Sequence, residues 1–157
     1  MSIILLGLNY KSAPVEIREK VSMSKSNIKR NLEYLQQMES VDGIAVLSTC
    51  NRTEFYMDAQ DGSKAVKGLM KFISWYSKCP VDLLEQHMYV KREREAVEHL
   101  FTVAAGLDSM ILGESQIQGQ VQDAYNYALE YHLSNNVINT LLMSALTLGK
   151  RVRTETY

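Results

Sequence analysis

A cysteine and an arginine, Cys50 and Arg52, stand two residues apart between two short runs that favour β-strands. The apolar run 44–47 and the β-forming run 53–57 place Cys50 at the end of a strand, where a turn follows. Asn51 tolerates left-handed turn geometry, so we expect the side chains of Cys50 and Arg52 to face a cleft instead of the core. A thiolate is the attacking form of cysteine and a nearby cation favours it, which makes Cys50 the candidate nucleophile.

A second interpretation of Cys50 stays open. A lone cysteine beside an apolar strand is more often a small buried side chain than a nucleophile. However, residues 49–54 are all polar or reactive, which is a poor composition for a core segment. The alternatives are therefore a catalytic thiol and a structural thiol in a non-catalytic binding module.

The composition is that of an ordinary globular protein. The chain has 157 residues, of which 46% are hydrophobic and 22% charged, enough for one domain with one core. A net charge of −1 argues against a broad basic face, so we expect any RNA contact to be local or shared with another part of a larger protein. The histidines lack zinc-ligand spacing to either cysteine, so no metal site is predicted. Few cysteines, no signal peptide and no long apolar run indicate a cytoplasmic protein with no membrane segment.

Hydrophobic periodicity predicts alternating strands and helices over residues 1–92. The expected strands are 3–8, 44–47, 53–57 and 87–90, and the expected helices are 16–21, a helix with Ser24 as N-cap, 65–76 and 81–85. We expect the helix after Ser24 to run for about 14 residues, an ordinary length for a globular protein. This order predicts an α+β protein with a ferredoxin-like βαββαβ antiparallel sheet and helices on one face. The non-catalytic alternative is a binding module of this same fold.

Residues 93–157 show helical patterns only. An apolar stripe over 96–104 ends at Gly106, a residue typical of helix C-termini. A second helix is expected over 116–131, and a third with Ser134 as its N-cap. No glycine-rich phosphate loop is evident, so no dinucleotide site is predicted in this chain.

Several short motifs resemble those of the glutamyl-tRNA reductase family, over essentially the whole chain. They are Ser48-Thr49-Cys50-Asn51-Arg52-Thr53-Glu54, Gly7-Leu8-Asn9, Lys11-Ser12-Ala13-Pro14, Gly106-Leu107-Asp108-Ser109 and Gly113-Glu114. The chain departs from the family at Tyr10, where histidine is usual, and at Ser115, where proline is usual. The resemblance implies one catalytic domain, 1–157, made of a ferredoxin-like part, 1–92, and a helical part, 93–157, that ends in a connecting helix.

The resemblance also implies an activity, that of an oxidoreductase. The Cys50 thiolate would attack the ester of glutamyl-tRNA(Glu), and NADPH would reduce the resulting thioester to glutamate-1-semialdehyde in the first step of tetrapyrrole (5-aminolevulinate) synthesis. The NADPH-binding and dimerisation domains of the family are expected to be absent here, so this chain alone should lack reductase activity. The implied partners are the charged tRNA, a second copy through the dimerisation domain, and the downstream aminomutase as a further candidate.

The resemblance finally implies a set of site residues. His99, which on an apolar helix is usually structural, matches a histidine that the family needs for activity, where it would orient substrate or assist proton transfer. The Arg52 guanidinium suits bidentate capture of a substrate carboxylate, and Glu114 can pair with the ammonium group of the glutamate. Cys79, beside Pro80, is interpreted as structural. The full set of implied substrate-binding residues is Thr49, Cys50, Asn51, Arg52, Ser109, Glu114, Ser115, Gln116 and Gln120.

Overall fold

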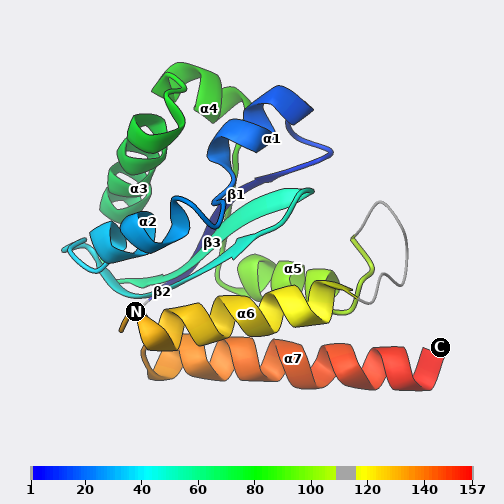
Figure 1. Ribbon diagram of the computed structural model, residues 1–157. Coiled ribbons are helices and arrows are strands. Elements are labelled where there is room, and N and C mark those ends of the chain that lie inside the picture. Colours follow the sequence, from blue (N-terminus) through cyan, green and yellow to red (C-terminus); the bar gives the residue numbers. More distant parts are fainter. Residues whose placement is uncertain (1, 109–115, 157) are drawn as a thin grey trace.

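The structure is a computed structural model that describes residues 2–108 and 116–156 (Figure 1). Its strands and helices follow the predicted order along the chain. None of the helices within these two ranges is long and apolar enough to cross a bilayer. The elements are β1 (Ser2–Asn9), α1 (Val15–Val21), α2 (Ile28–Leu35), β2 (Val41–Ser48), β3 (Arg52–Ala59), α3 (Gly62–Ser77), α4 (Val81–His87), β4 (Tyr89–Arg92), α5 (Arg94–Ala104), α6 (Gln116–Glu130) and α7 (Asn136–Thr156).

The strands form one antiparallel sheet in the order β2-β3-β1-β4. This arrangement confirms the predicted ferredoxin-like fold. In the register of the sheet, Asn9 lies opposite Arg52, and Gly7 lies opposite both Glu54 and Tyr89. The end of β1, the start of β3 and the start of β4 therefore lie side by side at one end of the sheet, together with the turn between β2 and β3.

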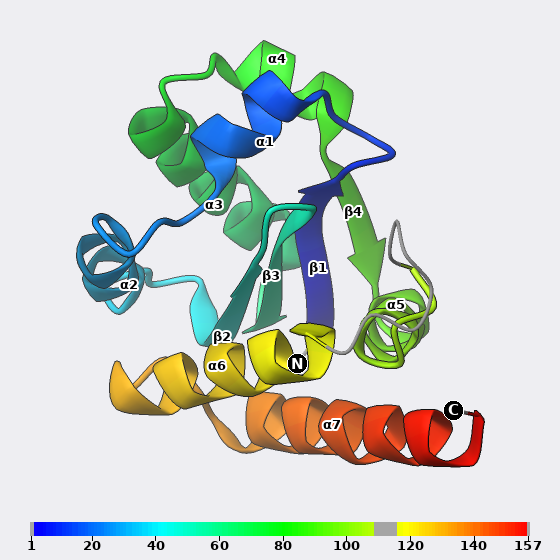
Figure 2. The same ribbon diagram turned by 45° about the vertical axis from the view of Figure 1, so that its right-hand side comes forward.

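Helices cover both faces of the sheet. Helices α1 to α4 lie on one face, as expected for residues 1–92, and α5 to α7 lie on the other (Figures 1 and 2). Helix α6 packs against the edge strand β2, and α7 packs against α5 and α6. Because both faces are covered, every residue of the central strand β3 is buried, including its charged ones. Polar side chains on this strand must therefore find partners inside the protein.

The N-cap residues of α2 and α7 differ from those predicted. Helix α2 has eight residues and begins at Ile28. Residues 24–27 form a turn instead, in which the Ser24 carbonyl accepts hydrogen bonds from the N–H groups of Asn27 and Ile28. The expected helix length of about 14 residues was therefore wrong. The buried side chains of α2 all lie within these eight residues. At α7 the cap is Asn135, not Ser134. Its Oδ1 accepts a bond from the N–H of Ile138 at 2.9 Å, while its Nδ2 donates to Asp58 at 2.8 Å, a tertiary contact that fixes the side chain.

Candidate active site

The turn between β2 and β3 is held by the hydroxyl of Thr49. Its Oγ1 accepts bonds from the backbone N–H groups of Asn51 at 3.1 Å and Arg52 at 3.2 Å. Cys50, which lies between Thr49 and Asn51 in this turn, is exposed and is a free thiol. The chain turns sharply here, as predicted, and Asn51 is not among the described residues with positive φ, so the turn forms without a left-handed residue at Asn51. The Thr49 hydroxyl makes a left-handed residue unnecessary, because it satisfies the two N–H groups that the turn exposes.

Arg52 is buried, with 2% of its surface exposed. Its Nη1 donates to Glu54 at 3.2 Å, and its Nη2 donates to the carbonyl oxygen of Asp108 and, at 3.2 Å, to the Asp108 carboxylate. The guanidinium thus joins β3 to the segment that follows α5. This position differs from the expectation that Cys50 and Arg52 face the same cleft, because Arg52 is the first residue of a strand with both faces covered while Cys50 stays in the turn.

Glu54 is the centre of a group of buried and half-buried polar side chains, which we call the Glu54 cluster: Arg52, Glu54, Tyr56, Tyr89 and His99. Glu54 itself is fully buried. Besides the bond from Arg52, its carboxylate accepts hydrogen bonds from Tyr56 at 2.7 Å, from Tyr89 at 2.5 Å and from His99 Nε2 at 2.5 Å. The donors come from β3, β4 and α5, so one carboxylate connects three elements.

Gly7 makes room for this carboxylate. It lies on β1 between Glu54 and Tyr89, which the register places on either side of it. A Cβ atom at Gly7 would lie 2.8 Å from Cγ of Glu54 and 3.0 Å from the carbonyl oxygen of Thr53. Any larger residue would therefore push the Glu54 side chain away from its donors on β4 and α5.

The charges of the Glu54 cluster stabilise one another. Burial by itself raises the pKa of Glu54, but the hydrogen bond and charge of His99 and the charge of Arg52 outweigh it, so the pKa of the carboxyl lies below its usual value. Burial lowers the pKa of Arg52, but the charge of Glu54 outweighs this and the net shift is upward. Burial and the Glu54 charge raise the pKa of both Tyr56 and Tyr89. At neutral pH the cluster therefore holds an ionised carboxylate, an arginine cation and two tyrosine donors.

An open polar hollow of about 390 Å³ lies beside the Glu54 cluster, lined by Tyr89, His99, Asn9, Lys11, Thr102 and Asp108 among others. Asp108, whose side chain is 17% exposed, forms its charged rim and pairs with Lys11 at 2.9 Å as well as with Arg52. Burial raises the pKa of Asp108, but the bond from Lys11 and the charge of Arg52 outweigh it and the net shift is downward. This is the place where a small charged ligand could meet both His99 and Asp108.

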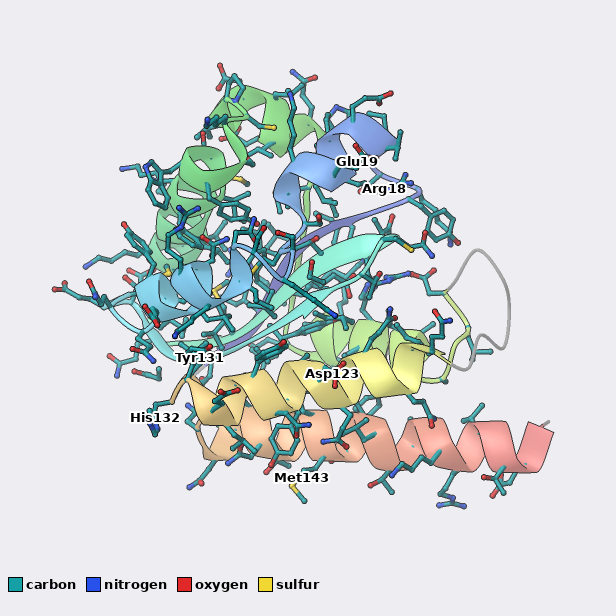
Figure 3. The ribbon with its side chains drawn as sticks, in the orientation of Figure 1. Arg18, Glu19, Asp123, Tyr131, His132 and Met143 are labelled. Atoms are coloured by element: carbon teal, nitrogen blue, oxygen red, sulfur yellow. The ribbon has the colours of Figure 1, made fainter. Side chains whose placement is uncertain are left out.

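The remaining predicted site residues are divided between two places. Gln120 lines a smaller cavity of about 150 Å³ between β2 and α6, together with Ser48 and Asp123, which is labelled on α6 in Figure 3. Ser48 directly precedes Thr49, so Gln120 borders the segment that leads into the cysteine turn. Gln116 is exposed at the start of α6. Ser109, Glu114 and Ser115 lie outside the described residues.

No metal or dinucleotide site is formed by the part of the chain that the structure describes. These residues contain no group of three or more His, Cys, Asp or Glu placed to hold a metal ion. All strand pairs in the sheet are antiparallel, whereas a dinucleotide fold needs parallel βαβ units with a glycine-rich turn. The residues described here therefore do not fit a nicotinamide cofactor.

The sequence matches the family described as glutamyl-tRNAGlu reductase, N-terminal domain, over residues 6–156. The chain belongs to this family. It is 46% identical to the glutamyl-tRNA reductase of Pelotomaculum thermopropionicum over 156 residues, and 46% identical to that of Heliobacterium mobile over 157. In both cases the match covers 99% of this chain and 35% of the relative.

A solved structure gives the same result. The structure titled glutamyl-tRNA reductase from Methanopyrus kandleri matches 98% of this chain with a TM-score of 0.77 and 32% sequence identity. The match covers 35% of that chain. This chain thus spans about a third of the length of the family members to which it is similar, and it shares their N-terminal fold.

Sequence reasoning did not predict Glu54, Tyr56, Tyr89 or Asp108 as site residues. One signal was present: Arg52, Glu54 and Tyr56 alternate in a strand-forming run, which places three polar side chains on one face. No comparable signal marks Tyr89 or Asp108, because their roles depend on contacts with β3 that lie far away in the sequence. Cys79 is 2% exposed, which agrees with its structural interpretation.

Proposed function

We propose that this chain is the catalytic domain of a glutamyl-tRNA reductase, and that Cys50 accepts the glutamyl group from charged tRNA. The observation that carries the proposal is the exposed thiol of Cys50 on a turn held by Thr49. In the rival interpretation, a non-catalytic binding module, Cys50 would be a buried structural residue, and its exposure argues against that role. Family membership supplies the substrate class.

The proposed step is transfer of an acyl group from oxygen to sulfur. The thiolate of Cys50 attacks the carbonyl carbon of the ester, a C–S bond forms, and the C–O bond to the ribose of the tRNA breaks. The ribose oxygen leaves with the bond electrons and takes up one proton. His99 is suited to supply that proton or to orient the ester, since its Nε2 is held by Glu54 and its Nδ1 has no hydrogen-bond partner among the described residues.

The burial of Arg52 bears on how the glutamate would be held. Its guanidinium is already paired with Glu54 and Asp108, so it has no open side for a further bidentate partner. We propose that a substrate carboxylate replaces the Asp108 carboxylate on Arg52, while Glu54 keeps the guanidinium in place. Asp108 is suited to such an exchange because it lies at the exposed rim of the hollow, and Lys11 remains there as its second partner.

The other expected components belong to the larger enzyme. The described residues do not fit NADPH, and this chain spans 35% of its relatives, so we assign hydride supply and dimerisation to regions of such enzymes that this chain does not match. No step of the reduction is assigned to residues of this chain. Glutamyl-tRNA(Glu) and the downstream aminomutase remain the proposed partners, and the cytoplasm the proposed location.

Mass spectrometry of the chain after incubation with glutamyl-tRNA tests the proposal. We expect one glutamyl adduct, mapped by peptide analysis to Cys50, with release of uncharged tRNA. Cys79 provides an internal control, because it is the only other cysteine and is buried. A chain that binds charged tRNA but never carries a glutamyl group on Cys50 would contradict the proposed acyl transfer and support a binding module.

A further inference from the structure

The exposed side of α3 carries a row of lysines interrupted by one tryptophan. Lys64, Lys67, Lys71 and Trp75 follow one another at intervals of three or four residues, which places them on a single stripe of the helix. Lys78, the C-cap residue, continues the row. All five residues are exposed, and Gly62–Ser77 contains no Asp or Glu.

The tryptophan belongs to a group of stacked aromatic rings shared with α2. The rings of Trp75 and Tyr34 lie 5.7 Å apart at an angle of 23°, and Tyr34 in turn stacks on Phe72 at 4.7 Å and 8°. Trp75 is nevertheless 59% exposed and Tyr34 49% exposed. The guanidinium of Arg30 lies over the Trp75 ring, 5.9 Å from its centre. This surface, defined by Arg30, Tyr34, Trp75 and the lysines of the row, is called the α2–α3 face.

An ordinary solvated helix surface does not explain the α2–α3 face. Solvated helices mix charges of both signs, whereas here the lysine row has one sign in a chain whose net charge is −1. The nearest acidic residues on the same elements are Asp61, which caps the start of α3, and Glu33, which follows Lys29 by one turn on α2. A large, half-exposed ring among cations is also typical of a contact surface.

We infer that the α2–α3 face binds unpaired nucleotides of an RNA strand. Single-stranded nucleic acids are held by aromatic rings on which bases stack and by cations that follow the phosphates, and this face offers both within one helix. Successive members of the row, Trp75 included, are separated along the helix axis by about 4.5–6 Å, from a rise of about 1.5 Å per residue. Arg30 shows that a planar cation already fits over the Trp75 ring, and a base can take the same position.

Two other classes of partner fit less well. Insertion into a membrane requires a broad apolar surface, but the exposed residues of α3 include no aliphatic side chain. An acidic peptide would satisfy the lysines but need not bring a planar group to stack on the exposed ring. The inference rests on the proposed function only in naming a tRNA as the natural strand. The α2–α3 face is on the opposite side of the sheet from α5, which carries His99 (Figure 2), so it would be an additional RNA contact separate from the Glu54 cluster.

Trp75 is the only tryptophan in the chain, so its fluorescence reports directly on this surface. Titration with an oligouridylate should quench the fluorescence, and the quenching should weaken as salt is added. The double variant Lys67→Gln/Lys71→Gln should bind more weakly, and the slope of log K against log salt should become shallower by about 1.4, from about 0.7 per phosphate contact. The matched control Lys20→Gln/Lys150→Gln removes the same charge from exposed sites elsewhere and should leave binding and slope unchanged.

Further arms separate the alternatives. Labelled oligouridylate should bind a folded Trp75→Leu variant at least about fivefold more weakly, since one stacked base contributes about 1–3 kcal/mol. The inference would be overturned if the Lys67→Gln/Lys71→Gln variant and the Lys20→Gln/Lys150→Gln control lost RNA binding equally. It would also be overturned if anionic vesicles or polyglutamate quenched the fluorescence as strongly as RNA. Repeating the titration with Cys50→Ser keeps the two proposals distinct. The Cys50→Ser variant should bind oligouridylate normally even if acyl transfer fails. Conversely, if the α2–α3 face does not bind RNA, a glutamyl adduct found on Cys50 still supports the proposed acyl transfer.

Discussion

The Nε2 atom of His99 and the carboxylate of Glu54 lie 2.5 Å apart, and this contact joins α5 to the central strand of the sheet. His99 is 14% exposed in its side chain and Glu54 is fully buried, so the contact runs from the hollow into the core. A carboxylate in this position fixes the orientation of the imidazole and the nitrogen that carries its proton. The role proposed for His99 therefore depends on Glu54, which does not itself line the hollow.

The first prediction concerns the nucleophile. Cys50→Ser should abolish the glutamyl adduct, because a hydroxyl is far less acidic than a thiol and forms almost no anion near neutral pH. Since Cys50 is exposed, the free energy of unfolding should change by less than about 0.5 kcal/mol. Thermal unfolding and adduct mass measured on the same sample check both parts. Undiminished acyl transfer by a folded serine variant would remove Cys50 from the mechanism.

The second prediction is that Arg52→Lys is not a conservative change. Lysine keeps the charge but cannot reach Glu54 and Asp108 together, so a buried pairing is lost and stability should fall by about 3 kcal/mol. Glutamyl transfer should weaken, while alkylation of Cys50 by a small reagent should continue at the rate of the parent chain. Denaturant unfolding and alkylation kinetics provide the measurements. If stability and transfer rate both match the parent chain, Arg52 has neither role.

The third prediction tests the proposed exchange at Arg52. Asp108→Asn weakens the competitor for the guanidinium, so a glutamyl substrate should bind more tightly to the variant, with a lower KM for adduct formation. Arg94→Gln is a suitable control, because it removes one member of an exposed pair on α5 that is far more solvated. A raised KM in Asp108→Asn would show that Asp108 contributes to binding instead of competing with the substrate.

The fourth prediction is a dependence of stability on pH. The folded pKa of Glu54 lies below its unfolded value, so its contribution to stability is full above the unfolded pKa of about 4.3 and is lost as pH falls through the folded pKa. Glu54→Gln should therefore be less stable than the parent chain at neutral pH by about 3 kcal/mol, and this difference should shrink below about pH 4.

Urea unfolding from pH 7 to pH 3 measures this difference. Glu19→Gln is the control, because Glu19 is exposed on α1 (Figure 3) and should give a curve like that of the parent chain. A gap between Glu54→Gln and the parent chain that stays constant down to pH 3 would mean that Glu54 is not held ionised by its donors.

The fifth prediction compares two glycines. Gly7→Ala should destabilise the protein by about 1–3 kcal/mol, because its methyl group meets the Glu54 side chain at 2.8 Å. Gly119→Ala should stabilise it by about 0.5–1 kcal/mol, because Gly119 lies within α6 and nothing surrounds its Cβ position within 4 Å. Thermal unfolding of both variants gives the comparison, and a neutral Gly7→Ala would show that the Glu54 side chain can move without loss.

The sequence by itself determined the secondary structure, the antiparallel fold and the place of Cys50 in a turn. These features depend on side-chain alternation, helical spacing and turn-forming residues, all of which act over a few neighbouring positions. The family motifs around Cys50 are equally local. Helix ends were less predictable, since Ser134 and Asn135 are both good caps and only the contact of Asn135 with Asp58 selects one.

The tertiary structure alone decided what surrounds Arg52 and Glu54. Alternation places Arg52 and Glu54 on one face of β3, but it does not tell which elements cover that face. The Glu54 partners Tyr89 and His99 are 35 and 45 residues away in the chain, and Asp108 is 56 residues from Arg52. A buried charge must be paired, and its partners are set by which helix and which strand pack against it. The local pattern therefore places the β3 members of the Glu54 cluster, while Tyr89 and His99 join it only through the packing of β4 and α5.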